Sequence, residues 1–172
     1  FDQAGMVRGA SKWDYELRNA EQVETVVDRM LTISMSEPRG PIYLALPREV
    51  LTAPAGDFTY NSPTRQHAAA PSVPNANALD KAAAMLGGAE NPLIITSWAG
   101  RNQGSFHALA DFAERYAIPV VQYRNRYMSI PSHHPMNLGY EPTALLEMAD
   151  VVMVVDTAVP WLPAEHKVRD NV

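Results

Sequence analysis

The chain has 172 residues, 47% hydrophobic and 19% charged, a composition that predicts a packed core rather than intrinsic disorder. Its net charge of −5 and pI near 5.5 argue against a nucleic-acid or anionic-membrane surface, since both need a basic patch. No apolar run approaches the roughly 20 residues of a membrane span, no signal peptide is recognisable, and the lack of cysteine excludes disulfides and thiolate ligands. We therefore expect a soluble, cytoplasmic protein of one or two domains.

Residues 1–51 are expected to be the C-terminal part of one α/β domain. Residues 1–18 show no sustained periodicity, so we predict an irregular connection with a short strand end at Met6–Arg8. Within this connection, the aromatic rings of Trp13 and Tyr15 are expected to anchor the segment on a neighbouring surface.

A helix and a strand follow in the same domain. Asn19 is the predicted N-cap of the helix, with Gln22 as its capping-box partner, and apolar residues recur at helical spacing over 23–31. The strand over 42–46 is apolar without alternation, as expected of a strand buried on both faces. A helix that leads into such a strand is half of a parallel crossover unit.

Residues 52–75 are predicted to form a linker. They contain four prolines and many small polar residues and fit neither helical nor strand periodicity. Phe58 and Tyr60 are expected to pin this segment to a domain surface.

Residues 76–172 alternate between helical and strand patterns. Helices are expected at 77–86, with Leu79, Ala82, Ala83 and Leu86 on one helical face, at 105–116, and from Pro142 to Ala149. Buried strands are expected at 92–97, 119–123 and 151–156, with a long irregular segment over 124–141. This alternation predicts an α/β fold with a parallel, Rossmann-like open sheet and helices on both faces, with a further strand expected beyond residue 172.

Ligands of open parallel sheets collect at the carboxyl ends of the strands, which points to the loops 98–104, 124–141 and 157–163. In the first loop, Gly100, Arg101 and Asn102 are the candidate nucleotide or anion contacts. The G-x-G-x-x-G spacing is broken, and no carboxylate follows the next strand, so a bound NAD is disfavoured.

The remaining polar residues favour structural roles. His133 and His134 are adjacent, so they point to opposite sides of an extended chain and are not expected to bind one metal ion. Arg124 is expected to form a surface salt bridge, Asp156 to cap its loop, and Trp161 to pack at an interface. We predict no metal site and assign no catalytic residue in this chain.

The order of these segments resembles the thiamine-diphosphate-dependent enzymes of the acetolactate synthase and benzoylformate decarboxylase group. In that family, a stretch similar to Gly40–Val50 closes the pyrimidine-binding domain, and a central Rossmann-like domain follows. Lys12-Trp13 looks like the segment before the last helix of the first domain. The central part is similar at Asn91–Ile95, Ile118–Val121, His134–Gly139 and Ala149–Val152.

This resemblance implies a parent enzyme that acts on a 2-oxo acid with thiamine diphosphate and Mg²⁺. It assigns 1–51 to the pyrimidine-binding domain, 52–75 to a linker and 76–172 to the central domain. The family's activating glutamate and its G-D-G…N segment are not found in this chain. We therefore expect a fragment that is inactive alone and that works with other domains and subunits in a homodimer or homotetramer.

Two alternatives stay open beside this reading. Some family members carry FAD in the central domain, but Tyr140-Glu141-Pro142 and the loop 157–161 depart from the family pattern and put FAD in doubt. The chain could also be a nucleotide-binding module that takes ADP or FAD at Gly100, or a purely architectural piece that holds catalytic domains together.

Overall fold

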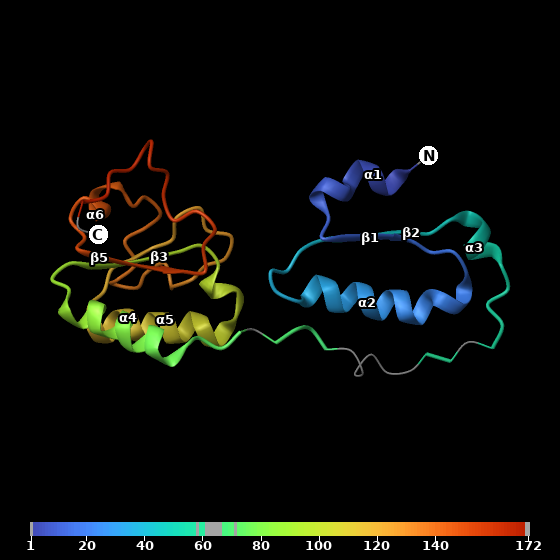
Figure 1. Cartoon of the computed structure of the whole chain (residues 1–172), viewed down its shortest axis with the longest axis horizontal. Coiled ribbons are helices and arrows are strands. Elements are labelled where there is room, and N and C mark those ends of the chain that lie inside the picture. The colour runs from blue at the N-terminus through green and yellow to red at the C-terminus, as the bar shows by residue number, and fades with distance from the viewer. Residues whose placement is uncertain (1, 58, 61–66, 71, 171–172) are drawn as a thin grey trace. The chain divides into compact units, whose positions relative to one another are not determined.

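The computed structural model describes residues 2–57, 59–60, 67–70 and 72–170. The chain forms two compact units, residues 1–73 and residues 74–172, each with its own parallel sheet. Figure 1 shows the elements of both units in chain order. In the described parts of the chain, no helix has the length and apolar character needed to cross a lipid bilayer.

The first unit is built on two parallel strands, β1 (Trp13–Glu16) and β2 (Ile42–Ala45). Trp13 lies opposite Ile42, and Glu16 lies opposite Ala45. The helix α2 (Val23–Met35) connects the strands, and it lies on the opposite side of them from α1 (Gln3–Val7) in Figure 1. This is the crossover unit that the sequence predicted, with one strand more than expected.

The expectation for residues 1–18 was wrong in two places. The predicted strand end at Met6–Arg8 is instead the end of helix α1 and the start of a 3-10 helix, η1 (Arg8–Ala10). The segment predicted to be irregular around Trp13 and Tyr15 contains strand β1, because its backbone groups pair with those of β2. The two rings lie stacked, with their centroids 5.5 Å apart.

The predicted cap at Asn19 forms, but it caps a 3-10 helix that precedes α2 rather than α2 itself. The side-chain oxygen of Asn19 accepts a hydrogen bond from the backbone N–H of Gln22 (3.1 Å) at the start of a 3-10 helix, η2 (Ala20–Gln22), that runs into α2. Gln22 does not complete a capping box: its side-chain oxygen accepts from the Tyr15 hydroxyl instead (3.3 Å). The Gln22 side chain therefore points toward strand β1 and not toward the start of the helix.

The last part of the first unit contains most of the predicted linker, residues 52–75. A short helix, α3 (Arg48–Thr52), which the sequence reading missed, follows Pro47. Beyond it, Tyr60 donates a hydrogen bond to Asp28 of α2 (2.9 Å), so the expected anchoring role of Tyr60 is confirmed. The backbone N–H of Ala69 donates to the Ser36 hydroxyl (2.9 Å). Phe58, the other predicted anchor, lies outside the described residues.

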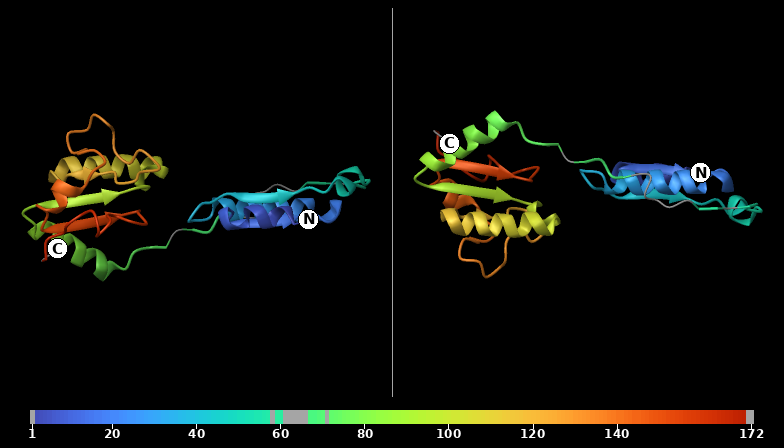
Figure 2. Two further views of the ribbon diagram at one scale, coloured as in Figure 1. Left: turned by 90° about the horizontal axis from the view of Figure 1, so that it is seen from above. Right: turned by 90° about the horizontal axis from the view of Figure 1, so that it is seen from below.

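The second unit has a parallel sheet of strand order β4-β3-β5, comprising β3 (Pro92–Thr96), β4 (Val120–Val121) and β5 (Val151–Val155). Helices α4 (Ala76–Gly88) and α5 (Gln103–Tyr116) lie on one side of this sheet, and α6 (Thr143–Leu146) lies on the other (Figures 1 and 2). A 3-10 helix, η4 (Ala99–Arg101), precedes α5. The predicted α/β class with a parallel sheet between helices is confirmed.

The central strand β3 is buried on both faces, as predicted. Leu93 and Ile95 point to a cluster that includes Leu146 of α6. Ile94, between them, points the other way, into a cluster with Ala110 and Ala113 of α5. This alternation follows from the period of two along a strand, and it joins both helical layers to one strand.

Two elements of this unit leave part of their apolar surface exposed. Only Ala82 and Leu86 of α4 are half-buried, whereas Leu79 is 54% exposed and Ala83 is also exposed. The strand β5, expected to be deeply buried, lies at the edge of the described sheet and leaves Val154 44% exposed. Apolar character in a segment predicts a surface to be covered, but it does not say which part of a protein covers it.

Candidate functional site

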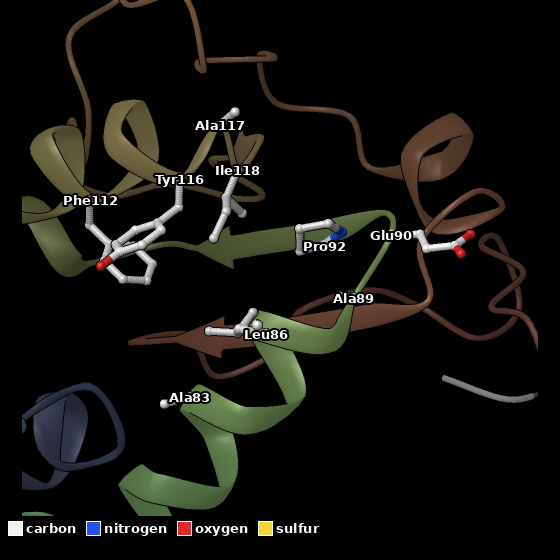
Figure 3. A pocket seen from close by; sticks show the side chains of 10 residues that line it. Ala83, Leu86, Ala89, Glu90, Pro92, Phe112, Tyr116, Ala117 and Ile118 are labelled. Atoms are coloured by element: carbon white, nitrogen blue, oxygen red, sulfur yellow. The ribbon is translucent and has the colours of Figure 1, made fainter.

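A groove of about 560 Å³ lies between α4 and α5 (Figure 3). Its walls are mostly apolar and include Leu86, Phe112 and Ile118, with Glu90 as the charged lining residue. Pro92 and Ile118 lie at or just before the amino ends of strands β3 and β4. Open parallel sheets bind their ligands at the opposite, carboxyl edge, so the groove is not where this fold places chemistry.

The carboxyl edge of the sheet is where the three predicted loops meet. The exit of β3 begins at Ser97, and Ser97 is 3% exposed despite its polar side chain. Its hydroxyl donates to the backbone oxygen of Tyr123, beyond β4 (2.6 Å), and lies 2.6 Å from the Thr157 hydroxyl, beyond β5. Because a serine hydroxyl has a single proton, Thr157 must be the donor in the second contact.

The backbone of Ser97 makes two further links. Its N–H donates to the backbone oxygen of Asp156 (3.3 Å), and its carbonyl accepts from the N–H of Arg126 (3.0 Å). One buried residue thus ties the exits of all three strands together. Ser97 was not among the predicted site residues. Its position as a polar residue at the end of an apolar strand was the feature of the sequence that could have pointed to it.

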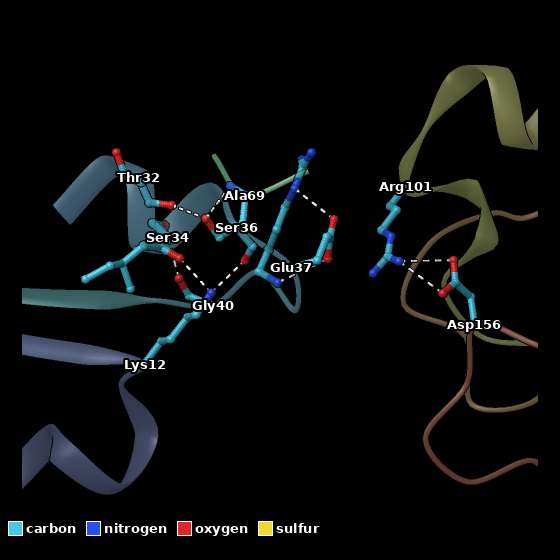
Figure 4. A network of polar contacts seen from close by, with 11 residues as sticks. Lys12, Thr32, Ser34, Ser36, Glu37, Gly40, Ala69, Arg101 and Asp156 are labelled. Atoms are coloured by element: carbon cyan, nitrogen blue, oxygen red, sulfur yellow. Dashed lines mark hydrogen bonds and ion pairs between the residues drawn. The ribbon is translucent and has the colours of Figure 1, made fainter. Parts of the chain in front are cut away.

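Arg101, one of the predicted anion contacts, is paired with Asp156. Its Nη2 atom donates to both carboxylate oxygens, at 3.0 and 3.1 Å (Figure 4). The pair joins the exit of β3 to the exit of β5. Asp156 has φ of 48°, in the left-handed region, which Asp and Asn tolerate better than most residues. The Asp156 carboxylate thus contacts Arg101 in the loop that follows β3. The backbone oxygen of Asp156 also accepts from the N–H groups of Ser97 and Trp98.

The other two predicted contacts also have partners inside the chain. A Cβ atom on Gly100 would lie 1.8 Å from the backbone oxygen of Met128, so this glycine permits close packing of the loop 124–141 on η4. The Asn102 side chain accepts from the N–H groups of Gly104 (2.8 Å) and Ser105 (3.4 Å) and caps α5. The structure therefore brings Gly100, Arg101 and Asn102 to the carboxyl edge and gives each a structural contact there.

The long loop is held by a buried amide that the sequence reading missed. Gln122 is 1% exposed, and its Oε1 atom accepts from the N–H of Ser129 (2.7 Å). The Arg124 guanidinium lies over the Tyr123 ring, 5.5 Å from its centroid, rather than in the surface salt bridge that was expected. His134 accepts the backbone N–H of Met136 at Nδ1 (3.2 Å). Among the described residues, no group of three or more acidic or histidine side chains is placed to hold a metal ion.

His166, which the sequence reading also missed, closes the last loop. It is buried, its Nε2 atom lies 3.1 Å from Glu141, and its ring meets the Tyr123 ring edge-on. Hydrogen bonds from the hydroxyl and N–H of Thr143, together with His166, hold the pKa of Glu141 below its usual range. Trp161, which was expected to pack at an interface, packs against the core cluster that contains Tyr123.

Comparison with known families gives a match over the second unit. Residues 79–169, more than half of the chain, match the family model for the central domain of thiamine pyrophosphate enzymes. The matched range contains all three strands of the sheet and the three exit loops described above.

Individual relatives match over nearly the whole chain. Oxalyl-CoA decarboxylase of Escherichia coli is 26% identical over 169 residues, 97% of this chain and 30% of that protein. Sulfoacetaldehyde acetyltransferase of Rhodobacter capsulatus is 29% identical over 166 residues, 91% of this chain and 27% of that protein. The crystal structure of benzoylformate decarboxylase from Polynucleobacter necessarius superposes with a TM-score of 0.70 and 22% identity over 94% of this chain and 32% of that one. The chain spans about a third or less of the length of these proteins.

Proposed function

The chain belongs to the thiamine pyrophosphate enzymes, and from this membership we propose that it is part of an enzyme that uses thiamine diphosphate to act on a 2-oxo acid. The observation that carries the proposal is the family match over residues 79–169. In such an enzyme the cofactor supplies the electron sink, and the protein orients it against the substrate. The reaction is proposed as a decarboxylation or a carboligation, because relatives of both kinds, a decarboxylase and an acetolactate synthase, match this chain.

Within that enzyme we assign this chain an architectural role. Residues 1–51 are proposed as the end of the pyrimidine-binding domain, 52–75 as a linker and 76–172 as the central domain. Supporting this division, the chain forms two compact units. Within the first unit, Tyr60 and Ala69 of the proposed linker are hydrogen-bonded to Asp28 and Ser36. The side chains that bind thiamine diphosphate and Mg²⁺ are proposed to lie in other parts of the enzyme, and no catalytic role is assigned to a residue of this chain.

The proposed partners follow from the same assignment. Other domains and subunits of the enzyme, as a homodimer or homotetramer, would cover surfaces such as the exposed side of α4. The small-molecule partner is the 2-oxo acid. We propose a cytoplasmic location, supported by the absence of cysteine, and we propose neither nucleic-acid nor membrane binding, supported by the negative net charge.

A second candidate function is nucleotide binding by the central domain. It is favoured by the position of Arg101 at the carboxyl edge of a parallel sheet, where ADP or the ADP part of FAD would bind. FAD binding is disfavoured because residues 140–142 and 157–161 depart from the family pattern. Titration of the chain with ADP and FAD separates this function from a purely architectural role.

Titration with thiamine diphosphate and Mg²⁺ tests the main proposal. The 172-residue chain is expected to bind neither at micromolar concentration and to show no turnover of 2-oxo acids. The protein encoded by the complete reading frame is expected to bind the cofactor and to consume a 2-oxo acid in a thiamine-diphosphate-dependent assay. Micromolar binding by the chain alone contradicts the architectural assignment, and a full-length protein without cofactor-dependent activity contradicts the enzymatic one.

A further inference from the structure

The loop that leaves β5 returns to the core of the second unit at a buried histidine. Residues 157–163 follow the carboxyl end of β5, and His166, which is 5% exposed, lies just beyond them. On either side of it, Trp161 and Val168 pack against the core cluster that contains Tyr123. Because histidine is the side chain that ordinarily changes charge between pH 5 and pH 8, a group that can respond to pH lies where this loop meets the core.

The partners of the ring determine which nitrogen carries the proton. The Nε2 atom of His166 lies 3.1 Å from Oε1 of Glu141, and the same oxygen accepts from the hydroxyl and the N–H of Thr143. The bond from the Thr143 hydroxyl, followed by that from its N–H, keeps the pKa of Glu141 below its usual range. The Glu141 carboxylate is therefore charged and can only accept, so Nε2 is the protonated nitrogen and Nδ1 of the neutral ring is an acceptor.

The surroundings of Nδ1 suit the neutral ring and oppose the charged one. Nδ1 accepts from the backbone N–H of Leu162 at 3.2 Å, so a proton on Nδ1 would make two donors face each other. The Leu162 carbonyl oxygen lies 3.1 Å from Nδ1, but it already accepts from the N–H groups of Glu165 (2.9 Å) and His166 (2.8 Å). Since a carbonyl oxygen has two lone pairs, the charged ring finds no free acceptor for Nδ1 at Leu162.

The charged groups around the ring do little to offset this conflict. Glu141 is the carboxylate that faces the ring, but its side chain is 70% exposed, so water screens its attraction for a positive charge. The Tyr123 ring meets the imidazole edge-on, and the group above Tyr123 is the Arg124 guanidinium, which is itself a cation. Along the chain, positions 165 and 167 are a glutamate and a lysine, both exposed and opposite in sign.

We propose that His166, with Leu162 and Glu141, forms a latch on the loop 157–163 that acid opens. In the neutral state, the ring bridges Leu162 and Glu141 and holds the loop against the core. When Nδ1 takes up a proton, the bond from the Leu162 N–H is lost and the loop is released. The latch thus stabilises the closed loop at neutral pH and loses this effect as the pH falls through the range in which histidine ionises.

The position of the loop gives the latch its consequence. Residues 157–163 form one of the three loops at the carboxyl edge of the sheet, the edge where open parallel sheets bind their ligands. Its first residue, Thr157, is tied to Ser97 at the exit of β3. Release of the other end at Leu162 would therefore open this edge from its outer side while the root of the loop stays attached.

Nuclear magnetic resonance on the 172-residue chain tests the latch at its own atoms. Two-bond nitrogen–proton spectra at pH 8 are expected to place the His166 proton on Nε2. Hydrogen exchange at the Leu162 amide, corrected for the intrinsic effect of pH, is expected to lose about fivefold in protection between pH 8 and pH 5, as for the loss of one hydrogen bond. The Ile94 amide of β3, which donates to the Pro119 carbonyl, is the internal reference and should stay protected.

Three variants separate the latch from a general effect of acid. His166→Asn keeps an acceptor close to the position of Nδ1 and cannot take up a proton, so the pH dependence at Leu162 should disappear. Glu141→Gln keeps an acceptor for Nε2 without the negative charge, so acid should cause a larger loss of protection than in the parent. His107→Asn removes an exposed histidine of α5 and should behave as the parent does.

Several outcomes would overturn the proposal. These are a Leu162 protection that stays constant or rises on acidification, a proton on Nδ1 at pH 8, or a His166→Asn variant that keeps the pH dependence of the parent. Equal losses at Leu162 and Ile94 also contradict it, because they indicate unfolding of the whole unit. The first two results and the last come from the parent chain, so they stand even if His166→Asn does not fold. None of them bears on cofactor-dependent activity of the longer enzyme.

Discussion

At the scale of single residues, Ser97 and Gly100 hold the carboxyl edge together. Ser97 satisfies groups from both neighbouring exits with one buried hydroxyl, and Gly100 lets the loop 124–141 approach η4 more closely than any side chain would allow. Both residues are small because the backbones around them are close. The edge is therefore a packed part of the fold as much as a candidate binding surface.

The close approach at Gly100 gives a direct prediction. In the Gly100→Ala variant, the new methyl group would meet the Met128 carbonyl at 1.8 Å, and only a backbone shift can relieve that contact. We expect a loss of about 1–3 kcal/mol in the free energy of unfolding, as for other overpacked sites. Urea denaturation followed by circular dichroism measures it.

Gly87→Ala is the matched control for this substitution. Gly87 lies in helix α4, and a Cβ atom there would meet no heavy atom within 4 Å. Because alanine favours a helix over glycine, the control is expected to be neutral or to stabilise by up to about 1 kcal/mol. Equal effects at positions 100 and 87 would contradict the packing argument.

Asp150 carries a prediction about pH. Its carboxylate accepts the N–H groups of Glu90 (2.7 Å) and Asn91 (2.9 Å), and these hydrogen bonds lower its pKa from the ordinary value of 3.8. A carboxyl group whose pKa is lower in the folded state stabilises the fold above its unfolded pKa and loses that contribution as the pH falls through the folded pKa. The stability difference between the parent and Asp150→Asn is therefore expected to be largest near neutral pH and to shrink below pH 3.8.

Urea midpoints at a series of pH values measure this difference. Asp111→Asn, at an exposed position of α5, is the control for a change in net charge. A difference between parent and Asp150→Asn that stays constant from neutral to acidic pH would show that the hydrogen bonds do not depend on the charge of the carboxylate.

At the scale of elements, the sequence predicted the helices and strands whose periodicity is long. The alternation of α4, β3, α5 and β5 could be predicted because each segment has its own apolar pattern. Strand β1 could not, because its four residues WDYE mix aromatic and acidic side chains and acquire strand structure only by pairing with β2. Short elements depend on partners that lie far away in the sequence.

The contacts of the candidate site also depend on residues that are far apart in the sequence. The sheet edge and its loops could be predicted from the fold class, and Gly100, Arg101 and Asn102 do lie there. Their contacts could not be predicted, since Arg101 pairs with a residue 55 positions away, and Gly100 packs against Met128 in another loop. Ser97, Gln122 and His166 were missed because a lone polar residue in a sequence gives no sign of the groups that surround it.

The predicted linker, residues 52–75, gives a prediction at this scale. Tyr60 donates a hydrogen bond to Asp28, a buried carboxylate of α2, and this contact raises the pKa of Tyr60 above its ordinary value. In Tyr60→Phe the contact is lost, and we expect faster cleavage within residues 52–75 by a protease of broad specificity. The exposed Tyr140→Phe is the control and should be cleaved at the rate of the parent. Equal rates for Tyr60→Phe and the parent would mean that this hydrogen bond does not protect the segment.

At the scale of the whole molecule, the apolar core is unevenly divided. Both core clusters consist of residues of the second unit. In the described part of the first unit, the buried apolar residues are Ala4, Leu17 and Val26. Because burial of apolar surface is the main favourable contribution to folding, the first unit should be much the less stable of the two.

This imbalance predicts two separate unfolding transitions. Trp13 reports on the first unit, and Trp98 and Trp161 report on the second. The fluorescence change of the parent is expected to occur in two steps, and the step at lower urea should disappear in Trp13→Phe. One transition, with the same midpoint in both proteins, would instead indicate that the two units unfold cooperatively.

The position of Ser97 also bears on how this protein could be redesigned. Since its single hydroxyl serves loops that begin after three different strands, a change of sequence in one loop alters the bonding available to the other two. Single-site libraries at this edge should therefore return mostly impaired variants. Combinatorial libraries that vary positions 97, 123 and 157 together are the ones in which strong epistasis, and any new binding activity, should be found.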